Sequence, residues 1–109
     1  MKLPIDVSRI TIIAISEPEP KLEYGQLVQR YNPQGVPLYS VSVLLSGTGD
    51  REDPTTRITF PSTQPPAIKR GDVLAAKALA ARSWSMRDNG RERTGIAFEA
   101  DAIEVSKTR

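Results

Sequence analysis

The chain has 109 residues, of which 39 % are hydrophobic and 26 % charged, and its formal net charge is +2. This size and composition predict one ordinary globular domain over residues 1–109. The sequence contains no cysteine and no histidine, which excludes disulfides, thiolate metal sites and histidine-based acid–base catalysis. Because its apolar runs are too short to span a membrane and its first residues do not resemble a signal peptide, we expect a cytoplasmic protein with no membrane partner.

The first half of the chain predicts short strands separated by proline and glycine. Residues 9–16 (RITIIAIS) are rich in β-branched side chains and predict a strand, which the following EPEPK interrupts. Residues 22–31 (LEYGQLVQRY) predict a second strand, and residues 32–35 (NPQG) suit a type I turn. Residues 37–47 (PLYSVSVLLSG) alternate between two faces. The segments on either side of the turn therefore predict a hairpin.

The second half of the chain is more ambiguous. Residues 57–61 (RITFP) predict a short strand. The alanine-rich residues 73–84 have helical propensity, but Gly71 before them and the hairpin turn RDNG after them favour a strand. Residues 95–105 alternate and then shift phase, which indicates a bulge. Five or six short strands must close or cover their edges, so we expect an all-β fold, a small five-stranded antiparallel barrel of the OB type.

Cations concentrate in one segment. Residues 69–95 carry seven lysines and arginines against three acidic residues, a local charge of +4, whereas the segments before and after each sum to −1. A basic segment on a nearly neutral body indicates a polyanionic partner. An ordinary solvated loop remains an equally good interpretation of the same charges.

Almost the whole chain is covered by one frame of segments, IDVSR…SEPEPK…QGVPLYSVSVLL…RITFP…GDVLAAKALAARSW…GIAFEADAI. It resembles a family of small accessory proteins, usually labelled regulatory, of actinobacterial plasmids and integrative elements. That resemblance implies a genetic context, the replication or transfer of a mobile element, more than an activity.

A second pattern consists of QGVPLYSVSVLL, RITFP, a glycine-led strand, a basic hairpin and a closing strand. This layout resembles filamentous-phage single-stranded-DNA-binding proteins of the gene V type. That family implies an OB-type barrel that dimerises and coats single strands. Residues 35–37 (GVP) match its Gly-x-Pro turn, but Leu38 stands where its aromatic residue would be and Tyr39 follows one position later. Arg57 matches its cationic strand position, whereas the aromatic tip of its protruding hairpin has no counterpart here.

Single-strand binding requires a cationic groove for the phosphates and aromatic faces for the bases. The candidates for stacking are Tyr31, Tyr39 and Trp84. The candidates for phosphate contacts are Arg30, Arg57, Lys77, Arg82, Arg87, Arg91 and Arg93.

Each candidate has an ordinary structural alternative. Arg82 and Trp84 share a face if they lie on a strand, but the tryptophan could also pack at the end of the barrel. Tyr39 alternates with apolar residues, as a tyrosine at the edge of the core would. Arg57 faces away from its apolar neighbours, as an ordinary solvent-facing strand residue also would. The arginines after Trp84 alternate with Asp88 and Glu92, so local ion pairing could neutralise part of their charge.

Enzymatic interpretations find little support. The acidic clusters EPEP and DRED show no pattern that would bury one carboxylate and expose another. The GTGD loop lacks the lysine of a phosphate-binding loop, and EF-hand spacing is absent.

We therefore expect no enzyme, no cofactor and no metal, and predict a single-stranded DNA-binding protein, with RNA and a homodimer left open. The alternative is an adaptor that docks by an edge strand onto a replication, transfer or regulatory protein. A double-stranded operator binder would need a helix over residues 73–84.

Overall fold

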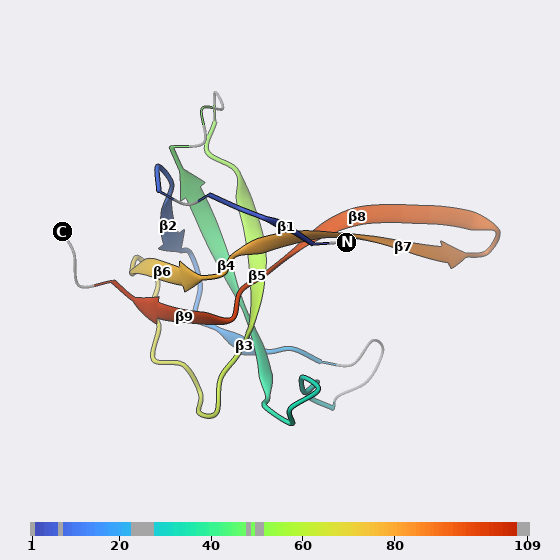
Figure 1. Cartoon of the computed structure of the whole chain (residues 1–109), viewed down its shortest axis with the longest axis horizontal. Coiled ribbons are helices and arrows are strands. Elements are labelled where there is room, and N and C mark those ends of the chain that lie inside the picture. Colours follow the sequence, from blue (N-terminus) through green and yellow to red (C-terminus); the bar gives the residue numbers. More distant parts are fainter. Residues whose placement is uncertain (1, 7, 23–27, 48, 50–51, 107–109) are drawn as a thin grey trace.

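The computed structural model describes residues 2–6, 8–22, 28–47, 49 and 52–106. In this part of the chain nine strands form one sheet and no helix occurs, which confirms the all-β class (Figure 1). The strands are β1 (Lys2–Pro4), β2 (Thr11–Ala14), β3 (Glu19–Pro20), β4 (Leu38–Ser46), β5 (Thr55–Pro61), β6 (Val73–Lys77), β7 (Ala80–Asp88), β8 (Arg91–Glu99) and β9 (Ala102–Val105). Over the described residues, no helix has the length and apolar character needed to cross a membrane.

The sheet curls into a half-barrel. Its strand order is β1-β7-β8-β5-β4-β2-β6-β9, with β3 added at β4. Neighbouring strands are antiparallel except β5 and β8, which run parallel and align Ile58 with Phe98. The backbone N–H of Ala100, just before β9, donates to the Thr59 carbonyl of β5 at 3.0 Å. This bond brings the start of β9, the last strand of the path, beside β5 in its middle.

A long hairpin, here called the hairpin arm, consists of β7 and β8. Its register runs from Ala80 opposite Glu99 to Asp88 opposite Arg91. Asn89 and Gly90 form its turn with φ values of 51° and 75°, the two positive angles of a type I′ turn. The hairpin predicted from RDNG is therefore confirmed, and Figure 1 shows the arm extending to the right, away from the other strands.

The core is filled by the side chains that point inward from alternate positions of the central strands. Phe60, Ile58, Val41 and Val43 are the largest fully buried side chains, and they come from the paired strands β4 and β5, where successive residues point to opposite faces. The remaining core residues are Ile12, Ala14, Tyr39, Ile68, Leu74, Leu79 and Ala100. Burial of these side chains is the main stabilising contribution to the half-barrel.

The described sheet has nine strands, where five or six were expected. One reason is that residues 73–84 form neither a helix nor a single strand. Ala78, with a φ of 56°, makes a corner that separates β6 from β7. β6 pairs with β2 and β9, while β7 pairs with β1 and β8, so sheet pairing on both sides overrides the helical propensity of the alanines.

The strand expected over residues 22–31 is also corrected. In its described part only isolated pairs occur, Leu22 with Gln29 and Tyr31 with Pro37, and residues 23–27 lie outside the described residues. The turn that follows is confirmed, because the Gly35 N–H donates to the Asn32 carbonyl at 2.9 Å. The phase shift in residues 95–105 marks the break between β8 and β9, where a bulge within one strand was expected.

Candidate nucleic-acid interface

A cleft of about 880 Å³ opens between the loop before β4 and the base of the hairpin arm. It has contributions from β1, from the start of β4, from the end of β5 and from the corner between β6 and β7. Its lining residues are Pro4, Arg30, Tyr31, Asn32, Pro33, Gln34, Leu38, Thr59, Pro61, Ala78, Leu79, Ala80, Arg82, Glu99, Ala100 and Asp101. Three predicted residues, Arg30, Tyr31 and Arg82, are thus brought together by parts of the chain that are distant in sequence.

The loop side of the cleft is held in place by backbone hydrogen bonds. The Arg30 N–H donates to the Lys21 carbonyl at 2.7 Å, and the Arg30 carbonyl accepts from the Leu38 N–H at 2.9 Å. The side-chain oxygen of Asn32 accepts from two backbone N–H groups, those of Gln34 and Val36. The Tyr31 ring, 57 % exposed, therefore stands on a defined loop beside the cleft and is accessible for stacking.

An ion pair forms the arm side of the cleft. Arg82 Nη2 lies 3.1 Å from Glu99 Oε2, and the two side chains are 48 % and 23 % exposed. They come from different strands of the arm, where the register sets Ala80 opposite Glu99 and Arg82 opposite Ala97. The carboxylate fixes the guanidinium at the edge of the cleft, with part of its surface still open to a ligand.

Trp84 lies on the arm, outside the core. It is 42 % exposed and sits opposite Gly95 in the register. A Cβ atom at Gly95 would come within 2.5 Å of the indole Cζ2, so the ring covers the glycine backbone. The missing side chain at position 95 makes room for the ring and leaves the indole supported on the arm with surface available to solvent.

We expect Gly95→Ala to displace the Trp84 indole, because a methyl group cannot occupy the same space as the ring. The displaced ring should gain solvent contact, and Trp84 fluorescence emission should move to longer wavelength while the thermal transition of the core persists. Thr94→Ala, a substitution at the neighbouring arm position, is the matched control and should leave emission unchanged. Unaltered emission in Gly95→Ala would contradict the seating of the ring on Gly95.

The two faces of the arm differ in chemistry. Arg82, Trp84 and Arg91 occupy register positions on one face, here called the Trp84 face, which continues from the cleft. Arg87 lies on the other face, directly opposite Glu92, and on the Trp84 face Arg91 is directly opposite Asp88, so opposite charges can compensate each other on both faces. The prediction that Arg82 and Trp84 share a strand face is confirmed, whereas Arg87 is separated from them. Arg93 is opposite Met86 in the register.

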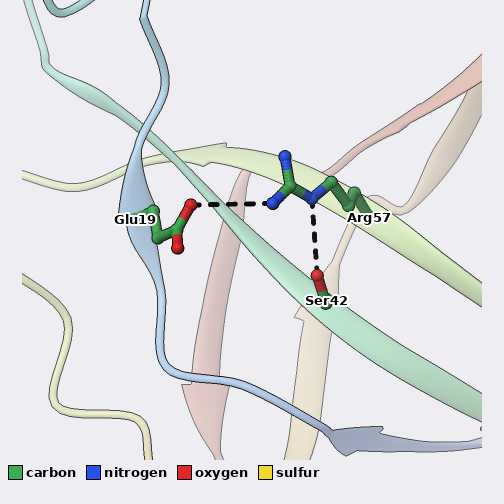
Figure 2. Close-up of polar contacts among 3 residues, drawn as sticks. All are labelled: Glu19, Ser42 and Arg57. Carbon is green, nitrogen blue, oxygen red and sulfur yellow. Dashed lines mark hydrogen bonds and ion pairs between the residues drawn. The ribbon is translucent and has the colours of Figure 1, made fainter.

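Three predicted residues lie outside both the cleft and the hairpin arm. Arg57 is exposed on β5 and contacts Glu19 (Nη2 to Oε2, 3.6 Å) and Ser42 (Nε to Oγ, 3.4 Å), as Figure 2 shows. Lys77 is exposed at the end of β6 and does not line the cleft. Tyr39 is only 8 % exposed, and its ring centroid is 6.4 Å from that of Phe60. The assignment of Tyr39 to an exposed stacking surface is therefore corrected, since it belongs to the core.

Sequence reasoning missed the acidic and amide side chains of the cleft. Asn32, Glu99 and Asp101 line it, yet none was a candidate, because single-strand binding predicts cations and aromatic residues. One signal was available: Glu99 alternates with Phe98 along the strand, which places it on the face opposite the apolar residue. Its meeting with Arg82 depends on the hairpin register and has no local sequence signal.

Within the described ranges, no group of three or more acidic residues is placed to hold a metal ion. No protein-family model matches the chain, and the comparison with curated proteins gives no match. The resemblances to plasmid accessory proteins and to gene V-type proteins accordingly stay predictions.

Proposed function

We propose that the protein binds single-stranded nucleic acid, in the first place DNA, along the cleft and the Trp84 face of the hairpin arm. The observation that carries this proposal is the meeting of an exposed aromatic ring, Tyr31, with Arg30 and Arg82 around one open cleft. Aromatic faces for bases and cations for phosphates are the two requirements of single-strand binding. Neither requirement depends on a particular base sequence.

The strand order supports an OB-type arrangement. Five of the strands, β2, β4, β5, β6 and β9, follow one another around the half-barrel as β5-β4-β2-β6-β9, with the Ala100–Thr59 hydrogen bond joining the start of β9 to β5. In OB folds ligands occupy the face of the second and third strands, between the first and the fourth loop. The corresponding loops here lie between β2 and β4 and between β6 and β9, and the cleft is lined by residues 30–34 of the first and by residues 78–80, 82 and 99–101 of the second.

The hairpin arm extends this site. Arg82 stands at the cleft, Trp84 follows two positions further along the same face, and Arg91 lies near the turn. A strand of nucleic acid leaving the cleft would meet a guanidinium, an indole and a second guanidinium in that order. Stacking on an aromatic ring contributes about 1–3 kcal/mol per base, so Trp84 is the strongest single contact expected on the arm.

Trp84 is the only tryptophan of the chain and therefore a built-in probe. We expect oligonucleotides of about 4–16 nucleotides, the site size of one OB fold, to quench its fluorescence at low salt. The apparent affinity should fall steeply as salt is raised, because phosphate contacts release counterions. Absence of both quenching and a mobility shift up to about 100 μM, the weak end of non-specific binding, would overturn the proposal. Parallel titrations with DNA and RNA decide between the two polymers.

A second candidate function, an adaptor for another protein, rests on a different observation. Leu3 and Ile96 are 59 % and 65 % exposed, and their register partners Ala81 and Ser83 place them on the arm face opposite Trp84. Exposed apolar side chains favour a protein partner on that face. The adaptor predicts a stable protein complex and no salt-sensitive affinity for DNA. A homodimer, and a role in replication or transfer of a mobile element, stay predictions from the sequence.

A further inference from the structure

The charge of the cleft differs from that of a phosphate groove. Its ionisable lining residues are Arg30, Arg82, Glu99 and Asp101, two cations and two anions, with a formal sum of zero. A groove that follows the phosphate backbone is positively charged. Carboxylates beside a phosphate would repel it, so the part of the cleft that they line suits a neutral part of the nucleic acid, the base itself, while phosphate contacts fall to Arg30 and to the exposed part of Arg82.

The two carboxylates come from chain segments with defined positions. Glu99 is held by Arg82 at 3.1 Å, and its side chain is 23 % exposed. The backbone of Asp101 is fixed by its N–H, which donates to the Lys77 carbonyl at 2.8 Å, and its side chain is exposed at the cleft. An ionised carboxylate only accepts hydrogen bonds. The two carboxylates of the cleft therefore favour a base that presents donors.

The bases differ in this respect. Cytosine, adenine and guanine each carry an exocyclic amino group with two N–H donors, whereas thymine and uracil carry no amino group, and their single ring N3–H lies between two carbonyl oxygens. Carbonyl oxygens next to Glu99 and Asp101 would meet acceptors, which is repulsive. Acidic side chains accepting from the cytosine amino group are an established pairing. The exposed Tyr31 ring at the cleft supplies a stacking face that all bases can use.

We propose that the cleft selects a base with an exocyclic amino group and disfavours thymine and uracil, with Glu99 and Asp101 as the specificity-determining acceptors. This inference rests on the single-strand binding proposed above. It divides the site into two parts: the cleft distinguishes bases, and the arm holds the adjoining strand through Trp84 and Arg91 without distinguishing them.

The test compares oligo-dC with oligo-dT of equal length, two pyrimidine polymers of the same charge, by the fluorescence anisotropy of a labelled strand. We expect oligo-dC to bind about tenfold more tightly, within the range that one good side-chain–base pairing gives. In Asp101→Asn and in Glu99→Gln the ratio should fall toward one, because an amide can donate to a thymine carbonyl as well as accept from a cytosine amino group.

Glu104→Gln is the matched control. Glu104 is exposed on β9 and does not line the cleft, so its replacement removes the same charge elsewhere. It should change the affinities for both polymers by the same factor and leave their ratio intact. Asp101→Asn serves as the second cleft variant because it does not break the ion pair with Arg82, and its folding is verified by its thermal transition.

The outcomes separate the two proposals. Equal, measurable binding of oligo-dC and oligo-dT by the unaltered protein overturns the base preference and leaves single-strand binding standing. An undiminished preference in both Asp101→Asn and Glu99→Gln overturns the assignment of the carboxylates. Failure to bind either polymer overturns single-strand binding and the base preference with it.

Discussion

Replacing Arg82 and Trp84 together by alanine is expected to weaken single-stranded DNA binding by about a hundredfold, while the half-barrel remains folded. Loss of one stacking platform removes about 1–3 kcal/mol, and loss of one phosphate contact reduces the salt dependence of log K by about one. Each 1.4 kcal/mol corresponds to a factor of ten in affinity. Both the affinity and its salt slope are measured by titration at several ionic strengths.

The fold should survive because neither side chain belongs to the core. Trp84 is 42 % exposed, and Arg82 is 48 % exposed in its pair with Glu99. Arg70→Ala is the control for the loss of a positive charge, since Arg70 is exposed before β6 and outside the cleft. Trp84→Ala alone separates stacking from charge. An unchanged affinity in the double variant would exclude the Trp84 face as the binding surface, and global unfolding would contradict its position outside the core.

Arg57 illustrates how the structure narrows the candidate site. Arg57 lies on β5, and its guanidinium contacts Glu19 and Ser42. This position does not line the cleft. An exposed ion pair of this kind contributes about 0–1 kcal/mol to stability. The sequence placed Arg57 on the solvent face correctly, but it could not show which exposed cations surround one cleft.

The sequence predicted the structure best where side chains alternate with the period of two that is typical of a strand. Tyr39, Val41 and Val43 alternate with serines, and the buried face of β4 follows directly from that alternation. The same alternation contradicts a stacking role for Tyr39, because a residue in phase with two buried valines points into the core. Tyr31 was the better candidate, since it lies in a loop where no such phase buries it.

The cleft could not be predicted from the sequence, because the residues that line it come from segments that are distant along the chain. Glu99 reaches Arg82 through the register of the arm, and the arm reaches β5 through a parallel pairing of Ile58 with Phe98. The corner at Ala78 adds to this, because its φ of 56° is uncommon for a residue other than glycine. Because an alanine in the sequence does not indicate such a corner, the sequence predicts one continuous element over residues 73–84.

Gly47→Ala is expected to destabilise the protein more than any surface substitution considered above, by about 2–5 kcal/mol. Gly47 follows β4 with a φ of 94°, where an L-residue costs about 1–2 kcal/mol. A Cβ atom there would also lie 2.5 Å from the carbonyl oxygen of Arg9. Because that atom belongs to the backbone, relief requires a backbone shift, which adds about 1–3 kcal/mol.

Gly49 provides the matched control for this effect. Its φ is 92°, but a Cβ atom there would meet nothing within 4 Å, so Gly49→Ala should show the conformational cost alone, about 1–2 kcal/mol. The difference between the two variants in urea denaturation isolates the contact with Arg9. That contact joins the end of β4 to the segment leading into β2, the two strands that pair from Thr11–Ser46 onward. Equal destabilisation by both substitutions would show that the approach of Arg9 to Gly47 is not a constraint on the fold.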